Sequence, residues 1–134
     1  MILLDTVAII LIATGERMRG EARALVLGAA PGTVAVSVVS YWELGVLGAR
    51  RGKTGRDLGP ARDWLTALVG DLGATVLSVS PEVALAAATS DYGLRDPADR
   101  LFVATARNID ATLVTRDRAI LALAQAGHVR AVAC

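Results

Sequence analysis

The segment Arg95–Asp117, RDPADRLFVATARNIDATLVTRD, contains the local signals that decide the fold. It begins with Asp96 before a proline, which is a helix N-cap followed by the residue favoured at the first helical position, and this predicts a helix over Pro97–Arg107. The short apolar run Ala111–Thr115 predicts a buried strand, and Asp117 then stands where the next helix would be capped. The segment therefore predicts a helix, a strand and a second helix start, with acids at the junctions.

The same signals continue along the rest of the chain and predict alternating strands and helices. The remaining strands are predicted over Met1–Leu4, Thr33–Val36, Thr75–Val79 and Val129–Ala133. The remaining helices are predicted over Val7–Ala13, Glu16–Leu27 and Val39–Arg50, from Pro60, from Pro81 after the cap Ser80, and over Arg118–Ala126. Because the strands are apolar on both faces, they call for a mainly parallel sheet with helices on both sides. We therefore expect one three-layer α/β domain over residues 1–134, with about five strands and with Val7–Ala13 as a fully buried helix.

The composition excludes several classes of protein. Hydrophobic residues make up 54% of the chain and aromatic residues only 4%, so the core is predicted to be aliphatic. A net charge of +1 argues against a strongly basic surface of the kind that coats nucleic acid without sequence preference. The only cysteine, Cys134, and the only histidine, His128, cannot form a disulfide or a zinc site. The run Val7–Ala13 is far shorter than the roughly 20 residues that cross a bilayer, and no signal peptide precedes it, so we expect a soluble cytoplasmic protein without membrane contact.

Acidic residues from distant parts of the chain are predicted to meet at one edge of this sheet. Asp5 directly follows the first strand, and Asp117 follows the strand Ala111–Thr115. Glu43 lies in the first turns of the helix that follows the second strand, and Asp99 lies in the first turn of the helix that begins at Pro97. Ligands of open α/β sheets bind beyond the carboxyl ends of the strands, near the switch in strand order. The predicted elements alone therefore bring the four carboxylates towards one site.

Each of these acids also has a structural interpretation. Capping alone explains Asp5 and Asp117, and Asp96 before a proline is fully explained as a cap. Asp99 lies three residues after Asp96, which resembles a capping box. Glu43 is harder to explain because it lies on the apolar side of its helix, where an ionised carboxylate is costly unless a charge compensates it. For these acids, a role as helix cap and a role in catalysis both remain open.

If the carboxylates do meet, they favour a particular chemistry. Close carboxylates repel one another and raise each other's pKa values, which a hard divalent cation would relieve. A set of ligands made only of oxygen suits Mg²⁺ or Mn²⁺ better than zinc. Such a site leaves room for a phosphate oxygen and activates a water molecule for attack on phosphorus. The residues therefore suggest metal-dependent hydrolysis of phosphodiester bonds.

The sequence resembles the PIN-domain ribonucleases, in particular the VapC-type toxins of bacterial toxin–antitoxin pairs. The resemblance is carried by Leu3-Leu4-Asp5-Thr6, by residues 37–44 (SVVSYWEL), by 96–100 (DPADR), by 104–106 (ATA) and by 113–117 (LVTRD). These short segments are specific together because their order and spacing agree over nearly the whole chain.

The resemblance implies a site and a biological role. It implies that Asp5, Glu43, Asp99 and Asp117 bind the metal and form the catalytic site of a Mg²⁺- or Mn²⁺-dependent endoribonuclease, with Asp96 mainly a cap. It also implies a homodimer and a VapB-type antitoxin whose C-terminal segment lies across the active site. The expected function is therefore that of a toxin that cuts single-stranded or looped RNA.

Two alternatives remain beside this interpretation. Val7 stands where the family often has a polar residue, so a degenerate PIN domain that binds RNA or a protein partner without cleavage is the first alternative. The second is a phosphatase or receiver-like domain with Asp5 as phosphoryl acceptor, although the Asp-x-Asp pattern of the phosphatases is missing after the first strand.

Several basic and aromatic residues are further candidates. Arg100 and Arg116 lie beside the proposed acids and are expected to contact RNA phosphates. The run that contains Arg50, Arg51, Lys53 and Arg56 either grips RNA or forms a solvated loop. We expect Trp42 and Trp64 to be core or dimer contacts and His128 to be structural.

Overall fold

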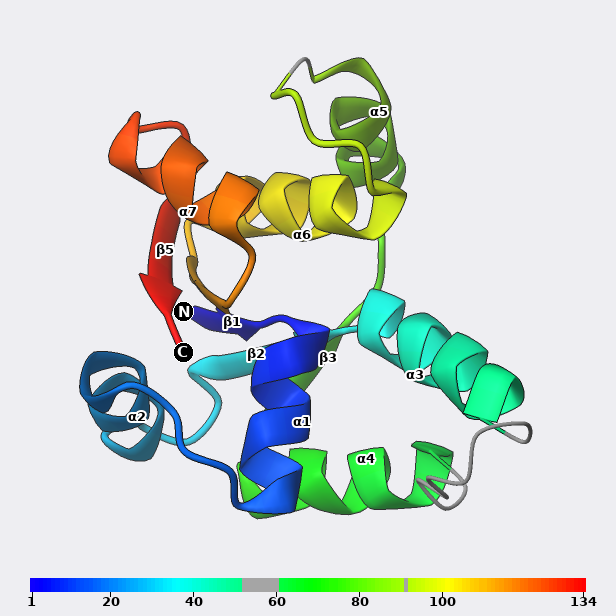
Figure 1. Cartoon of the computed structure of the whole chain (residues 1–134), viewed down its shortest axis with the longest axis vertical. Coiled ribbons are helices and arrows are strands. Elements are labelled where there is room, and N and C mark those ends of the chain that lie inside the picture. Colours follow the sequence, from blue (N-terminus) through cyan, green and yellow to red (C-terminus); the bar gives the residue numbers. More distant parts are fainter. Residues whose placement is uncertain (52–60, 91) are drawn as a thin grey trace.

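The computed structural model describes the backbone of residues 1–51, 61–90 and 92–134, and the side chains of all of these except 49–51 and 61–62. Strands and helices alternate along the described chain (Figure 1), as the sequence predicts. The strands are β1 (Ile2–Leu4), β2 (Val34–Ser37), β3 (Thr75–Leu77), β4 (Thr112–Thr115) and β5 (Arg130–Ala133). The helices are α1 (Thr6–Thr14), α2 (Gly20–Leu27), α3 (Val38–Arg51), α4 (Ala61–Asp71), α5 (Pro81–Thr89), α6 (Pro97–Asn108) and α7 (Arg118–Gln125).

The five described strands form one sheet in the order β3-β2-β1-β4-β5, and every pair of neighbours is parallel. Leu4 of β1 is in register with Val36 of β2 on one side and with Val114 of β4 on the other. The chain builds outward from β1 through β2 to β3 and then returns to the other side of β1 with β4. The switch in strand order therefore lies between β1 and β4, where ligands bind in folds of this kind.

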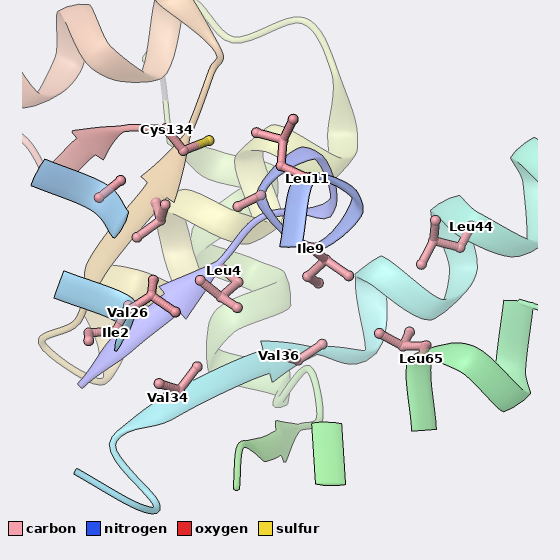
Figure 2. Packing of buried hydrophobic residues seen from close by; sticks show 13 residues of the cluster. Ile2, Leu4, Ile9, Leu11, Val26, Val34, Val36, Leu44, Leu65 and Cys134 are labelled. Carbon is pink, nitrogen blue, oxygen red and sulfur yellow. The ribbon is translucent and has the colours of Figure 1, made fainter. Parts of the chain in front are cut away.

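Helices cover both faces of the sheet because successive strand residues point to opposite sides. Leu4 and Val36 face a cluster that includes Ile9 of α1, Leu44 of α3 and Leu65 of α4 (Figure 2). A second cluster, on the opposite face, is built from residues of β1, β2 and β4 and of helices α6 and α7: Leu3, Ala35, Leu113, Phe102, Val103 and Ile120. Helix α5 packs against α6 through a smaller cluster. The predicted three-layer α/β architecture is therefore confirmed.

The helix predicted over Glu16–Leu27 begins later, at Gly20. Gly15 adopts a left-handed conformation with φ of 66° and ends α1. The backbone N–H groups of Gly15 and Glu16 then donate to carbonyls of α1, in the manner of a helix C-cap. Residues 16–19 therefore close α1 and connect it to α2, instead of starting a helix of their own.

Two expectations about burial were wrong. Helix α1 is not fully buried, since the side chain of Val7 is 42% exposed. Strand β3 is an edge strand, so Val76 is 43% exposed although the strand was expected to be apolar on both faces. Of the two roles expected for the tryptophans, core or dimer contact, Trp42 at 60% exposure is left with the dimer contact, whereas Trp64 packs partly buried against the core.

The basic run around Lys53 and the helix start predicted at Pro60 fall outside the described residues and side chains. Within the helices that the structure describes, none has the length and apolar character needed to cross a bilayer.

Candidate functional site

Asp5 stands immediately after β1, at the carboxyl edge of the sheet and beside the switch point. Its Oδ1 accepts a hydrogen bond of 2.6 Å from the backbone N–H of Ala8, so the residue caps α1 as the sequence predicts. The side chain is only 6% exposed. Burial raises the pKa of Asp5, against hydrogen bonds from Thr115 and Ala8 that lower it, and the charge of Glu43 raises it further. Asp5 is thus both a cap and a buried carboxylate beside another acid.

Asp117 reaches the same edge from β4. Its Oδ1 accepts from the backbone N–H of Ile120 at 2.8 Å and caps α7. Its own backbone N–H donates at 3.0 Å to the hydroxyl of Thr115, which is fully buried and is in turn hydrogen bonded to the carboxylate of Asp5. Thr115 therefore links the acid that follows β1 to the acid that follows β4.

Glu43 approaches from α3 and is partly buried. Its Oε2 is hydrogen bonded to the hydroxyl of Thr6, the residue after Asp5. Burial raises the pKa of Glu43, and the charge of Asp96 raises it further, while the Thr6 hydroxyl opposes both. The buried position predicted from the helix pattern is therefore confirmed in part, but the compensating group is a neutral hydroxyl and no arginine is paired with Glu43 in the described structure.

Asp99 is the acid whose pKa is affected by the charges of all the others. It lies in the first turn of α6 and makes no hydrogen bond within the described structure. Burial, followed by the charges of Asp117, Asp96, Glu43 and Asp5, raises its pKa to about 7. The capping box predicted with Asp96 is absent, because Asp96 caps α6 alone by accepting from Ala98 at 2.8 Å.

The four predicted acids are therefore brought into one electrostatic cluster, and a fifth acid, Asp96, belongs to it. We define the acidic cluster as Asp5, Glu43, Asp96, Asp99 and Asp117. Across the part of the chain that the structure describes, the one ion pair joins Arg130 and Asp110, which is away from the cluster. No three acidic, histidine or cysteine side chains of the described residues stand close enough to enclose an ion as they are. The cluster therefore carries negative charge that no base of the described structure compensates, and its side chains do not form a closed metal site.

Sequence reasoning missed the polar residues that support the acids. Thr6 and Ser40 are buried, at 6% and 0% exposure, and their hydroxyl oxygens lie 3.2 Å apart. Thr115 is equally buried between the carboxylates that follow β1 and β4. A usable signal was present, since Thr6 directly follows Asp5 and a hydroxyl residue stands three positions before Glu43 on the same helix face.

The two arginines predicted to contact substrate already make structural contacts. Arg100 Nε donates to the carbonyl of Leu94 at 2.6 Å. Arg116 Nε donates to the carbonyl of Cys134 at 3.0 Å, and its Nη2 donates to the carbonyl of Arg17 at 3.1 Å. Arg100 thus keeps both of its terminal amino groups free within the described structure, whereas Arg116 joins the last strand to the α1–α2 connection.

Comparisons with known proteins agree with this fold. The PIN domain family matches residues 2–126, and the chain belongs to this family. A search of curated proteins found no match. PIN domains are generally nucleases, which supports a hydrolase at a coarse level.

Solved structures share the fold at low sequence identity. VapBC2 from Rickettsia felis, bound to a DNA fragment from its promoter, is 16% identical, with a TM-score of 0.70 and coverage of 99% of this chain and 98% of that one. FitAB bound to the IR36 DNA fragment is 23% identical, with a TM-score of 0.69 and coverage of 99% and 94%. A toxin–antitoxin complex from Klebsiella pneumoniae is 23% identical, with a TM-score of 0.57 and coverage of 87% of both chains. At these identities the likeness establishes the fold.

Proposed function

We propose that the protein is the toxin component of a type II toxin–antitoxin module of the VapC kind, an endoribonuclease that depends on Mg²⁺ or Mn²⁺. The observation that carries the proposal is the electrostatic state of Asp99. Its carboxyl group faces the charges of four other acids, and no basic side chain of the described structure is paired with it. A protein retains such repulsion when a ligand needs it, because repelling carboxylates lower stability unless something compensates them.

The donor set fits a hard divalent cation. All candidate ligands are carboxylate oxygens, which suit Mg²⁺ or Mn²⁺, and the raised pKa values of Asp5, Glu43 and Asp99 are what a cation would reverse. Asp5, Glu43 and Asp99 would hold the cation, with Asp117 assisting directly or through water. Capping does not exclude this role, because a carboxylate oxygen that accepts a hydrogen bond keeps further lone pairs for a cation.

The cation, when bound, would supply the activated water and the charge that stabilises an in-line displacement at phosphorus. The rest of the chain holds the acidic side chains in position. The caps on α1 and α7 and the Thr115 bridge hold Asp5 and Asp117 in place. Arg100 would offer its free amino groups to an RNA phosphate beside Asp99, so that an anionic substrate can approach an acidic site.

The comparisons support a partner of a defined kind. The similar structures are described as VapBC2, FitAB and a toxin–antitoxin complex, so we propose that this chain also pairs with an antitoxin. An acidic cluster without paired bases is suited to an arginine presented by the antitoxin, which would occupy the place of the cation. We further propose that the toxin forms a homodimer, and the exposed Trp42 on α3 is a residue suited to that contact.

Cleavage of RNA with and without a divalent cation tests the proposal. The purified chain should cut single-stranded RNA in Mg²⁺ or Mn²⁺ and be inactive after chelation. Asp5→Asn should be inactive although it can still cap α1. The proposal would be wrong if RNA were cut equally well in a chelator, or if Asp5→Asn retained the activity of the parent.

A degenerate PIN domain is the alternative, and Val7 favours it. This side chain is exposed in the first turn of α1, next to Asp5, and offers no hydrogen bond to the site or to substrate. Calorimetric titration separates the two functions. RNA binding without any Mg²⁺ or Mn²⁺ binding near neutral pH would favour the degenerate domain.

A further inference from the structure

A cleft of about 380 Å³ lies between α5 and the start of α6. The two helices pack side by side (Figure 1). The wall on the α5 side consists of alanines, whose side chains end at Cβ and leave the cleft open to a ligand. The other side includes two arginines from the segment that begins α6. The residues that line the cleft are Ala84, Ala87, Ala88, Arg95, Pro97, Arg100 and Leu101.

The two arginines of this cleft carry positive charge that nothing described compensates. Neither Arg95 nor Arg100 forms an ion pair with any residue that the structure describes, and no acidic side chain among those residues lines the cleft. Asp96 lies between them in the sequence, but it caps α6 by accepting from the backbone N–H of Ala98. Two unpaired like charges beside one cleft favour an anion there.

Arg100 is already held in an orientation that suits a phosphate. Its Nε donates at 2.6 Å to the carbonyl of Leu94, a residue that is only 2% exposed. This bond fixes the guanidinium plane and leaves the two terminal amino groups to donate to a ligand. A guanidinium can donate two parallel hydrogen bonds to two oxygens of one phosphate. Because the side chain is ordered beforehand, binding costs less conformational entropy.

The cleft lies close to the acidic cluster along the same helix. Arg100 directly follows Asp99 in α6, and successive residues of a helix point about 100° apart around its axis. The cluster and the cleft therefore occupy neighbouring sides of the first turn of α6. A nucleic-acid strand carries a negative charge at every nucleotide, so one phosphate can lie at the cluster while another lies in the cleft.

We propose that the α5–α6 cleft is a phosphate subsite, in which Arg95 and Arg100 bind a phosphodiester of single-stranded RNA that flanks the one to be cut. The inference rests on the proposed nuclease function and adds where the strand lies beyond the acidic cluster. Contacts to phosphate fix the register of a strand and carry no base preference. The subsite therefore contributes affinity and alignment, and leaves sequence preference to other contacts.

The test is fluorescence anisotropy of a labelled single-stranded RNA titrated with the protein in a chelating buffer, where cation-dependent cleavage does not occur. Arg95→Gln should weaken binding by roughly 3-fold to 10-fold, the scale of one exposed charged hydrogen-bond contact. The slope of log affinity against log salt should become shallower by about 0.7, because one phosphate contact is lost. The fold should persist, since Arg95 is exposed and unpaired in the described structure.

Arg23→Gln is the matched control for this charge. Arg23 is exposed on α2 and also forms no ion pair within the described residues. Helix α2 packs against the face of the sheet opposite to the one that α6 covers. The same loss of charge there should change RNA affinity by less than about 2-fold, because distant surface charges are screened by salt.

A second pair of variants tests the cleft without touching an arginine. Ala84 and Ala86 are both exposed on α5, but only Ala84 lines the cleft. Ala84→Glu would place a carboxylate against the bound phosphate and should weaken RNA binding by roughly 10-fold. Ala86→Glu adds the same charge to the same helix and should leave the affinity within about 2-fold of the parent.

Arg100→Lys tests the second arginine. It keeps the positive charge but lacks the planar pair of amino groups, so RNA affinity should fall by roughly 3-fold. The salt slope should match that of the parent, because no charge is lost. A thermal melt in the same buffer checks that the fold survives the loss of the bond to Leu94. If this variant is unfolded, the Ala84→Glu and Ala86→Glu pair decides.

Several results would overturn the inference. These are an Arg95→Gln protein that binds RNA like Arg23→Gln, an Ala84→Glu protein that binds like Ala86→Glu, a folded Arg100→Lys protein with parental affinity, or a parent that does not bind single-stranded RNA in the chelating buffer.

Cleavage of RNA by the same parent sample in Mn²⁺ is measured separately. A parent that binds RNA through the cleft but cuts none would contradict the proposed nuclease function and leave the subsite in place. A parent that cuts RNA while the cleft variants bind like their controls would contradict the subsite alone.

Discussion

The two ends of the sheet differ in whether their charged residues have partners. At the carboxyl ends of β1 and β4, the acidic cluster gathers carboxylates that are paired with no base in the described structure, and burial and neighbouring charge raise the pKa values of Asp5 and Asp99. At the amino ends of β4 and β5, the charges are compensated. Arg130 forms an ion pair of 2.7 Å with Asp110, and the guanidinium of Arg107 lies 5.2 Å from the ring centre of Tyr92.

The presence of a cavity does not by itself mark a site for a charged ligand. A cavity of about 600 Å³ lies at the amino end, lined by residues that include Arg107, Asp110 and His128. Arg130 and Asp110 pair with each other, Arg107 donates to the hydroxyl of Tyr92, and the ring of His128 lies 5.8 Å from that of Tyr92 between centres. The cavity therefore lacks the electrostatic imbalance that marks a site for a charged ligand. Uncompensated charge identifies the site better than size does.

The largest expected effect comes from removing one charge of the cluster. Asp99→Asn should reduce RNA cleavage on the order of 1000-fold, the scale of losing several kcal/mol of metal-assisted stabilisation. Steady-state cleavage of a labelled RNA measures this loss. The fold should be intact, because Asp99 caps no helix and makes no hydrogen bond in the described structure. If the Asp99→Asn protein stayed active, Asp99 would be excluded as a catalytic acid, and the proposed site would lose the residue on which it depends most.

Cation binding should stabilise the folded protein, because binding to the native state alone shifts the unfolding equilibrium. At a concentration about 100 times the dissociation constant, Mn²⁺ should add about 2.7 kcal/mol to the free energy of unfolding. For a domain of this size, that corresponds to roughly 8 °C in the melting temperature. Thermal melts with and without Mn²⁺ measure the shift, and the Asp99→Asn protein should lose most of it. Equal shifts in the two proteins would place the cation elsewhere.

The metal-free protein should become less stable as the pH rises from about 4 to about 7. The pKa of Asp99 is raised from 3.8 to about 7, so in this window the folded state keeps a proton that the unfolded state has lost. The unfolded state then binds fewer protons, and linkage makes the free energy of unfolding decrease with pH. Because the side chain is partly exposed, we expect only about 5 °C of decrease in the melting temperature.

Thermal melts across this pH window, in a chelating buffer, measure the slope. The raised pKa values of Asp5 and Glu43 act in the same direction, so Asp99→Asn should flatten the slope without abolishing it. A stability that rises steadily over the window would show that the carboxylates are paired in solution.

The contrast between the two ends also explains what sequence could predict. The acids were predictable because local signals place them: Asp5 and Asp117 follow apolar strands, and parallel strands deliver their carboxyl ends to one edge. Glu43 was predictable because a helical pattern puts it on an apolar side. The family resemblance led to the same residues by an independent route.

What escaped prediction depends on contacts between distant parts of the chain. The bond from Thr6 to Glu43 spans 37 positions, and the local pattern around Thr6 describes only a helix start. The charge of Asp96 in the cluster was missed because its cap explained it completely. Exposure of Val76 at the sheet edge follows from strand order, which apolar runs do not encode.

The smallest effect should come from the compensated end. Asp110→Asn removes the ion pair with Arg130. The side chain of Arg130 is 58% exposed and that of Asp110 is 89% exposed, so the free energy of unfolding should fall by about 0.5 kcal/mol or less. Asn suits the backbone because Asp110 has a φ of 53°, a left-handed conformation that Asn tolerates. Melting and cleavage should both stay close to the parent, in contrast to Asp99→Asn, which removes the same charge. A large loss of cleavage in Asp110→Asn would mean that both ends of the sheet take part in function, and charge imbalance would then no longer mark the site.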